Sequence, residues 1–562
     1  MFPSHDSALR RRALLGGAVA AGLPLATAGA TKGPAAAAAA GPSRSSARPT
    51  TRTRRPNIIV ILADDLGYGA LGAYGQQVVR TPHLDRLARE GIRFTQGYSG
   101  ASVCAPSRTT LLTGMHAGHT RVRSNAFRTT GEQPRLERGD TTIAEVLRAG
   151  GYRTGVFGKW GFGDDDLVTP NPLGLACGIH QPADVGRGNF AVANRRDPSH
   201  PLQKGFDRFV GMVTTEHAFQ YWPDFLWSDN RRFRLRGNEG EQRGTYAPQV
   251  HLDGALSFID RHRDDEFFLY YAPQLVHFPN EVPDTRAYDD KVGWTPEMKA
   301  YAAQYTLLDT YVGRIIDRLK RHGLDDKTLV VFTSDNGPTP NEHALAGSGR
   351  CTDVLTPSPT SGLADVLWRT NGGLRAGKHS LYEGGIRVPL IAWGPGVVKA
   401  DRRAVADRPW GSVDLLPTLA DIAGVTPPAD VDGVSVRPWI TGERPAGRRA
   451  HPPLYFERPP NTDQNLDGGP PAQLVYTTAV RWGRWKAVRH APGRTPTIAD
   501  NQALFELYDL AADPAERRNV AALNPAVARR LQAYLRSAHS PAPKRRLRYR
   551  PRLTGRAVRV RR

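Results

Sequence analysis

Asn57-Ile58-Ile59-Val60-Ile61-Leu62 is the stretch that decides the fold, and Ala63-Asp64-Asp65 follows it directly. A continuous apolar run of this length is typical of a central parallel strand that is buried on both faces. Four further stretches have the same character: residues 153–157, 267–271, 329–333 and 388–393. We therefore expect a sheet made mostly of parallel strands.

Helical patterns lie between these strands. One helix is expected to begin at Thr81-Pro82, an N-cap residue followed by proline in the first turn. Another is expected over residues 301–318, where apolar side chains recur at helical spacing: Tyr305, Leu308, Val312 and Ile315. Alternating strands and helices predict an α/β fold, whose ligands gather at the carboxyl ends of the strands.

The two ends of the chain differ from this body. Residues 1–30 carry Arg10-Arg11-Arg12 before a mild apolar stretch and small residues, which is the layout of a twin-arginine export signal. Residues 31–55, with six consecutive alanines, are expected to be a disordered linker. We expect the main domain over 56–450. A smaller domain is expected over 451–540, from strand-like runs and a final helical pattern: 475–480, 485–488, 504–510 and 525–538.

The net charge of +22 is concentrated at these ends. Residues 1–55 carry +8 and residues 544–562 carry +10, so the rest of the chain carries +4. This distribution does not favour a nucleic-acid-binding protein, because no recognition motif accompanies the basic tail at 541–562. Mean hydropathy is −0.46, and after the N-terminus no run approaches the roughly eighteen apolar residues of a membrane span.

Two acidic pairs follow strand-like runs. Asp64-Asp65 comes after the first run, and Asp335-Asn336 follows the run at 329–333. Either pair alone has a simple alternative, a helix cap or a tight turn. Two carboxylates in one dry pocket need a counter-charge, and hard oxygen ligands suit Ca²⁺ or Mg²⁺. Together the two pairs favour a metal site.

A lone cysteine stands in Val103-Cys104-Ala105-Pro106-Ser107-Arg108, near the end of what we expect to be an exposed loop. Its surroundings do not match the signatures of cysteine proteases. The C-x-P-x-R pattern resembles the signature of the type I sulfatases, in which the cysteine is oxidised to formylglycine. Residues 479–486 and 506–514 likewise resemble the C-terminal subdomain of that family.

The resemblance implies an alkaline-phosphatase-like α/β core with a smaller C-terminal antiparallel sheet. It implies that a formylglycine-generating enzyme modifies Cys104 and that a divalent cation, Ca²⁺ or alternatively Mg²⁺, is bound by five residues: Asp64, Asp65, Cys104, Asp335 and Asn336. One hydroxyl of the hydrated aldehyde would attack sulfur, and the second would then expel sulfate. A serine has no second hydroxyl to release the sulfate, so the reaction would stop at a serine sulfate ester.

The resemblance also nominates charged residues for the sulfate group: Arg108, Lys159 and Lys378. The alternative for each is a solvated surface charge, the usual state of Lys and Arg. His277, together with Lys378, is the candidate that protonates the leaving alcohol.

One position departs from the family pattern. Many sulfatases have histidine two residues after the equivalent of Lys159, where this chain has Gly161. His217 is a hypothetical replacement for this base, and a structural role for it is the alternative. His116 and His119 are weaker candidates. Cys177 and Cys351 remain as a possible disulfide pair.

We thus expect an exported sulfatase that acts on sulfated carbohydrates or, as a second choice, on small aryl sulfates. Residues 219–227 are rich in aromatic side chains and predict either a sugar-binding wall or core packing. Two other functions stay open: a phosphate or phosphonate monoester hydrolase of the same superfamily, and a non-catalytic protein that binds anionic glycans.

Overall fold

The computed structural model describes residues 55–125, 134–163, 197–215, 217–239, 242–339, 369–402, 406–443, 451–460, 475–541, 552–554 and 558. All of these described residues belong to one compact unit. The expected export signal, nearly all of the linker and most of the basic tail lie outside the described residues, as do Cys177 and Cys351. Predictions about them remain predictions.

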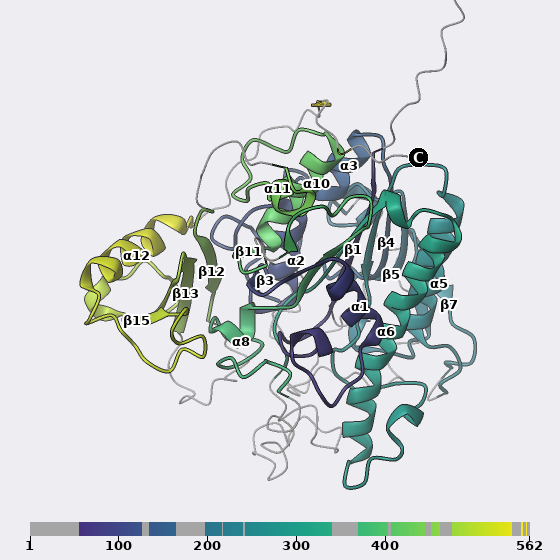
Figure 1. The fold of residues 1–562 in the computed structure, drawn as a ribbon, viewed down its shortest axis with the longest axis horizontal. Coiled ribbons are helices and arrows are strands. Elements are labelled where there is room, and N and C mark those ends of the chain that lie inside the picture. Colours follow the sequence, from purple (N-terminus) through teal and green to yellow (C-terminus); the bar gives the residue numbers. More distant parts are fainter. Residues whose placement is uncertain are drawn as a thin grey trace, which may run out of the picture. The chain divides into compact units, whose positions relative to one another are not determined.

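Within the described part of the chain, the central sheet has nine strands in the order β2-β10-β9-β1-β8-β4-β5-β6-β7 (Figure 1). Its strands are β1 Asn57–Ala63, β2 Ile92–Phe94, β4 Arg153–Lys159, β5 Arg208–Met212, β6 Phe225–Ser228, β7 Arg231–Arg234, β8 Phe267–Ala272, β9 Thr328–Ser334 and β10 Leu390–Trp393. The five strands from β9 to β5 run parallel, and antiparallel strands flank them on both sides. The predicted α/β fold with a mostly parallel sheet is confirmed.

Both faces of β1 are covered, which explains its unbroken apolar run. Ile59 and Ile61 pack with side chains of helices α1 (Pro82–Glu90), α5 (Ala247–Arg261) and α6 (Pro296–Arg321). Ile58, Val60 and Leu62 face the opposite cluster, which contains helices α2 (Cys104–Thr113), α3 (Ile143–Ala149) and α10 (Leu415–Ala423). Because successive side chains of a strand point to opposite faces, burial on both sides requires apolar residues throughout.

Helix α1 begins where predicted, but its cap comes from elsewhere. Thr81 occupies the N-cap position and makes no capping hydrogen bond. The backbone N–H groups of His83 and Leu84 instead donate to the carboxylate of Asp309 on α6, at 3.2 and 2.7 Å. A tertiary contact thus satisfies the free N–H groups of the first helical turn.

The C-terminal part is a four-stranded antiparallel sheet in the order β12-β13-β14-β15, with helix α12 packed against it (Figure 1). Its elements are β12 Leu454–Arg458, β13 Val475–Trp482, β14 Trp485–Pro492, β15 Leu504–Asp509 and α12 Pro525–Ala538. The fully buried Lys486 of β14 bonds Glu383 at 3.0 Å and Glu516 at 2.9 Å. Glu383 begins the short helix α8 (Glu383–Ile386), so this ion cluster ties the C-terminal sheet to that helix.

None of the helices in the described ranges combines the length and the apolar character that crossing a bilayer requires.

Candidate active site

Four neighbouring parallel strands deliver the polar residues of the site to one edge of the sheet. Asp64-Asp65 follows β1, Asp335-Asn336 follows β9, and Lys159 ends β4. His277 lies in the segment after β8. Because β9, β1, β8 and β4 are adjacent, their carboxyl ends bring together residues that are up to 272 positions apart.

Cys104 does not lie in an exposed loop, so that prediction is wrong. It is the first residue of α2 and is 1% exposed, and all ten residues of the helix are buried. The helix lies in the core between the sheet and α10, which buries its sides as well as its start. This position aims Cys104 at the end of β1.

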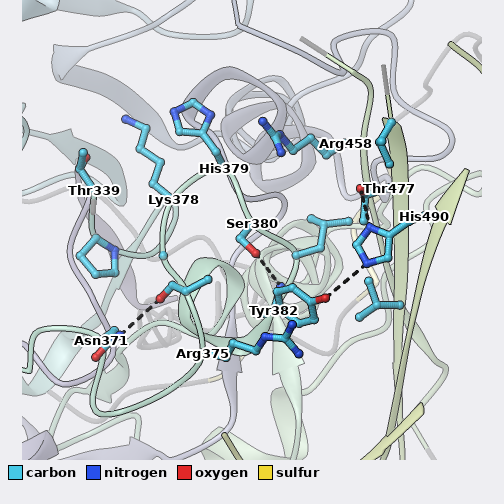
Figure 2. A pocket seen from close by; sticks show the side chains of 16 residues that line it. Thr339, Asn371, Arg375, Lys378, His379, Ser380, Tyr382, Arg458, Thr477 and His490 are labelled. Carbon is cyan, nitrogen blue, oxygen red and sulfur yellow. Dashed lines mark hydrogen bonds between the residues drawn. The ribbon is translucent and has the colours of Figure 1, made fainter. Parts of the chain in front are cut away.

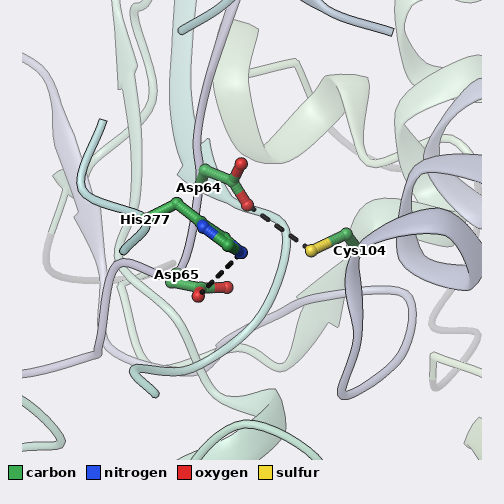
Figure 3. Close-up of side chains that lie close together, drawn as sticks. All are labelled: Asp64, Asp65, Cys104 and His277. Carbon is green, nitrogen blue, oxygen red and sulfur yellow. Dashed lines mark hydrogen bonds and ion pairs between the residues drawn. The ribbon is translucent and has the colours of Figure 1, made fainter. Parts of the chain in front are cut away.

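The predicted metal ligands lie together around Cys104. Its Sγ is 3.5 Å from Oδ1 of Asp64, and its neighbours include Asp65 and His277, whose ligating atoms all lie within 4.8 Å of one another (Figure 3). Asp335 accepts a hydrogen bond from the backbone N–H of Asp65 at 3.2 Å. Asn336 donates from Nδ2 to Asp65 at 2.8 Å.

Three buried cations bind these acids. Arg108, Lys159 and Lys378 are therefore not the solvated surface charges that the sequence left as the alternative. Arg108 bonds Asp335 through Nε and Nη2 at 3.0 and 2.8 Å, and its Nη2 lies 3.7 Å from Asp64. Lys159 bonds Asp64 at 2.7 Å. Lys378 reaches Asp65 at 2.8 Å. The site is therefore a closed network of opposite charges.

Burial and these cations shift the acids in different directions. Burial raises the pKa of Asp64 and Asp65, but the cations outweigh it: Lys159 holds Asp64 well below its usual pKa, and Lys378 lowers the pKa of Asp65 to about 2. Burial and the charge of Asp64 raise the pKa of Asp335 to about 6. Burial also raises the pKa of Cys104 to about 12. An unmodified Cys104 would thus be a thiol, which is a poor nucleophile.

The donor set fits a hard divalent cation. Carboxylate and amide oxygens are the ligands that Ca²⁺ and Mg²⁺ prefer. Oδ1 of Asn336 is buried and accepts no hydrogen bond from the residues that the structure describes. Burial raises the pKa of Asp335, and the negative charge of the neighbouring Asp64 raises it further; two carboxylates this close repel each other. A divalent ion would satisfy the amide oxygen and relieve that repulsion.

His277 and Lys378 are joined by a hydrogen bond. Nδ1 of His277 bonds the Phe278 carbonyl, so it carries the ring proton, and Nε2 faces Nζ of Lys378 at 3.2 Å. Burial and the nearby Lys378 lower the pKa of His277 to about 4. The ammonium of Lys378 is therefore the group that holds the transferable proton, and His277 accepts a hydrogen bond from it.

His217 lies apart from this network. Its Nε2 bonds the Phe225 carbonyl at 3.1 Å and its ring packs against Phe225. The charged side chain that affects its pKa is Arg232 rather than a carboxylate of the site. This placement favours the structural alternative and gives no support to His217 as the base.

Gly161 itself lies beside Arg108. At this position (φ +89°) an added Cβ would lie 3.6 Å from the Arg108 side chain and 3.9 Å from Oγ1 of Thr215.

His217 and the fully buried His251 of α5 predict a loss of stability in acid. Burial lowers the pKa of His251 to about 3 and that of His217 to about 4, whereas an unfolded histidine titrates near 6.5. Below pH 6.5 the unfolded chain binds more protons than the folded protein does. The free energy of unfolding is therefore highest above about pH 6.5 and falls as the pH drops toward 3.

We expect His251→Leu to weaken this dependence, by up to about 1.4 kcal/mol per pH unit between pH 6 and 4. The measurement is the thermal midpoint of both proteins at pH 7.5 and 5. Equal losses in the two proteins would show that His251 is not a source of the acid sensitivity.

His116 and His119 form a separate cluster with Asp432. Nδ1 of His119 lies 2.9 Å from the Asp432 carboxylate, and the two rings stack with centroids 4.1 Å apart. Nδ1 of His116 accepts a hydrogen bond from the backbone N–H of Gly118 at 3.1 Å, which leaves the proton on Nε2. This tautomer points a proton rather than a lone pair at Asp432, so the cluster fits a structural role better than a metal site.

The aromatic segment 219–227 is mostly core. Tyr221, Phe225 and Trp227 are buried. Phe219 and Trp222 are half-buried, and the ring of Phe219 meets that of His277 edge-on with centroids 4.7 Å apart.

Thr339 is a residue of the site that was not predicted. The hydroxyl of Thr339 donates to Asp65 at 2.6 Å. Thr339 follows Asn336 by three residues, so a search for hydroxyl groups just beyond the second acidic pair would have found it.

Comparison with known proteins agrees with this geometry. The family model described as Sulfatase matches residues 56–425. The chain belongs to the sulfatase family. A second model, N-sulphoglucosamine sulphohydrolase, C-terminal, matches residues 376–539 of this sulfatase. Membership makes the protein a sulfuric ester hydrolase, and the resemblance expected from the C-x-P-x-R pattern is confirmed.

Individual relatives cover most of the chain. Human arylsulfatase A is 32% identical over 83% of this sulfatase and 83% of its own length. An N-acetylgalactosamine-6-O-sulfatase of Bacteroides thetaiotaomicron is 29% identical over 86% of this chain and 93% of its own. A solved sulfatase structure, described in connection with glycosaminoglycan metabolism by the same bacterium, has a TM-score of 0.62 at 26% identity and covers 86% of this chain and 99% of its own.

The phosphonate monoester hydrolase of Agrobacterium radiobacter shares the fold alone. Its TM-score is 0.53 at 21% identity, with 86% of this chain and 95% of its own covered. The alternative of a phosphate or phosphonate hydrolase is therefore not favoured.

Proposed function

We propose that the protein hydrolyses sulfate esters of carbohydrates through a formylglycine made from Cys104, with Ca²⁺, or alternatively Mg²⁺, held by Asp64, Asp65, Asp335 and Asn336. One observation carries the proposal: Sγ of Cys104 lies 3.5 Å from Asp64, inside a ring of buried acids and cations. A formylglycine-generating enzyme is the maturation partner that this proposal requires. The carbohydrate part is supported by the relative that acts on N-acetylgalactosamine 6-O-sulfate.

The residues around Cys104 supply binding and proton transfer. The divalent cation would provide positive charge where the sulfate oxygens and the nucleophile meet. A hydrated formylglycine would supply two hydroxyls on one carbon, one to attack sulfur and one to release sulfate. Arg108 and Lys159 lie against different carboxylate oxygens of Asp64 and place fixed positive charge there.

Lys378 and His277 suit the protonation of the leaving alcohol. Nζ of Lys378 carries a proton that His277 and Asp65 orient, and the three groups lie within 3.6 Å of one another. Lys378 also borders a cavity in which a leaving group can lie. The lysine is thus the donor, and His277 positions it.

The test is the mass of the peptide that contains residue 104, from protein produced together with a formylglycine-generating enzyme. Conversion of the thiol to the aldehyde lowers the peptide mass, and the converted protein is expected to turn over nitrophenyl sulfate faster than nitrophenyl phosphate. An unmodified thiol in active protein would contradict the proposed nucleophile. Faster turnover of the phosphate would contradict the proposed substrate.

We also propose that the protein is exported by the twin-arginine pathway, as residues 10–30 suggest. Replacing Arg10, Arg11 and Arg12 by lysine is expected to keep the protein in the cytoplasm, as measured by fractionation. Unchanged export of this variant would contradict the assignment.

A further inference from the structure

Lys378 is presented by a short loop, residues 375–385, that closes on itself. The backbone N–H of Gly384 donates to the carbonyl of Arg375 at 2.8 Å, so the two ends of the loop meet. On the side of the active site, the backbone N–H of Lys378 donates to the carbonyl of Pro338 at 2.7 Å, just past the second acidic pair. The shape of the loop therefore decides where the side chain of this lysine can lie.

The backbone on both sides of Lys378 has an unfavourable conformation. Ala376 (φ +59°) and His379 (φ +71°) lie in the left-handed region, which residues with a Cβ rarely adopt. Such residues persist only where the surrounding contacts hold them, and they are frequent at functional sites. The loop therefore needs contacts that keep it in this shape.

Glu516 supplies such contacts to both ends of the loop. Its backbone carbonyl accepts a hydrogen bond from Nη1 of Arg375 at 3.0 Å, and its carboxylate accepts one from the backbone N–H of Glu383 at 2.6 Å. Glu516 follows strand β15, is 1% exposed and is itself left-handed (φ +54°). One residue of the C-terminal part thus binds the loop near its start and near its end.

Lys486 holds the two acids of this cluster together. Its ammonium is fully buried and lies 3.0 Å from Glu383 and 2.9 Å from Glu516. Tyr98 also donates to Glu383 at 3.0 Å, and Arg387 lies 3.5 Å from the same carboxylate. Burying charges costs nearly as much free energy as their attraction returns, so stability alone does not account for the cluster. What the cluster does is fix the position of Glu383.

Two side chains of the loop attach it to the same C-terminal sheet (Figure 2). The Tyr382 hydroxyl donates to Glu506 at 2.6 Å and lies 3.3 Å from Nε2 of His490. Arg375 lies over the Tyr382 ring, with 3.6 Å from Cζ to the ring centroid. In the same view Lys378 points away from this sheet. The loop is thus anchored in the C-terminal sheet and presents Lys378 on its opposite side.

We propose that Glu516 and Lys486 are positioning residues of the active site: they hold the loop 375–385 so that the ammonium of Lys378 lies where it can protonate the leaving alcohol. The inference rests on the proton-donor role proposed above for Lys378. Neither residue needs to touch the substrate, since each acts through Glu383 and the loop.

The test compares kcat/KM for nitrophenyl sulfate and for phenyl sulfate, with the matured full-length protein. Nitrophenolate leaves readily without a proton, whereas the more basic phenolate depends on a proton donor. We expect Glu516→Ala to reduce kcat/KM for phenyl sulfate about tenfold to a hundredfold more than for nitrophenyl sulfate, a part of the roughly 10²–10⁴ that a positioned acid contributes. Lys378→Ala should change the ratio of the two values in the same direction and by more.

A double variant shows whether Glu516 acts through Lys378. Once Lys378→Ala has removed the donor, adding Glu516→Ala should not change the ratio further, because both substitutions remove the same effect. Glu516→Gln keeps an acceptor for the N–H of Glu383 and should restore most of the wild-type ratio. Lys486→Arg keeps the charge in a different shape, so it should shift the ratio as Glu516→Ala does, and it serves if that variant does not fold.

Glu457→Ala is the matched control. Glu457 of β12 is also 1% exposed, and it binds Tyr455, Tyr476 and His539 rather than the loop. Its replacement should lower the thermal midpoint and leave the ratio of the two kcat/KM values unchanged.

The outcomes separate the two proposals. If the wild type hydrolyses neither ester, the proposed function fails. If Lys378→Ala leaves the ratio unchanged, the proton-donor role fails and the inference with it. If Glu516→Ala reduces both kcat/KM values equally, or if the double variant shifts the ratio beyond Lys378→Ala, the function stands and the positioning role is overturned.

Discussion

A Cys104→Ser variant is expected to fold normally and to lose sustained turnover of nitrophenyl sulfate by about 10³-fold or more, the size of loss seen when a covalent nucleophile is removed. The serine hydroxyl would lie next to Asp64, where Sγ of Cys104 lies at 3.5 Å. It can attack sulfur once, but the resulting ester has no second hydroxyl to expel sulfate. At most one equivalent of nitrophenol per protein should therefore be released.

Intact-mass analysis after exposure to substrate checks this prediction, because the serine variant should gain the mass of one SO3 unit and Cys104→Ala should gain none. Thr110→Val is the matched control: it lies in the same buried helix, and its Oγ1 bonds no described residue. Sustained turnover by the serine variant would show that residue 104 is not the nucleophile.

Replacing Arg108 is expected to damage both stability and catalysis. Arg108 is fully buried and holds Asp335 with two hydrogen bonds, close to Asp64. Arg108→Met leaves these carboxylates without that cation, and breaking a buried pair in this way costs about 3–5 kcal/mol. Arg108→Lys keeps the charge but loses the two-point geometry, so we expect kcat to fall by about 10²–10³, as when one fixed donor to the transition state is removed.

The thermal midpoint in EDTA and in Ca²⁺ tests the stability part. Arg108→Met should be destabilised more in EDTA than in Ca²⁺, because a bound divalent cation supplies part of the missing positive charge. The exposed Arg286→Lys is the control and should leave both measurements unchanged. Equal destabilisation of Arg108→Met in the two conditions would argue against a cation beside Asp335.

The fold was predictable wherever a pattern repeats locally. The run at 58–63 is apolar at every position because both of its faces are buried, and that requirement can be read from six residues. Helix α12 was predicted over 525–538 and is observed over Pro525–Ala538. By contrast, β12 was not predicted, because five residues between prolines carry too little pattern to be distinguished from a loop.

The candidate site was predictable as a set of residues and not as a set of contacts. Asp64 and Asp335 stand out because each follows a buried strand. Their cations were nominated only through the family resemblance, because a lysine or arginine on the surface and one in a buried ion pair have the same local sequence. That Arg108 bonds Asp335, 227 residues away, depends on the neighbouring positions of β1 and β9 in the sheet and on the packing of α2 against it.

The amino-acid sequence by itself determined which chemical groups are present: acids after strands, a cysteine four residues before an arginine, and strands buried on both faces. These are properties of single segments, since each follows from the backbone and burial that the segment needs. Only the tertiary structure decided that Cys104 is buried at the start of a helix, that His217 faces a backbone carbonyl, and that Arg108 bonds Asp335. Such contacts depend on strand order and register across the chain, and no local pattern encodes them.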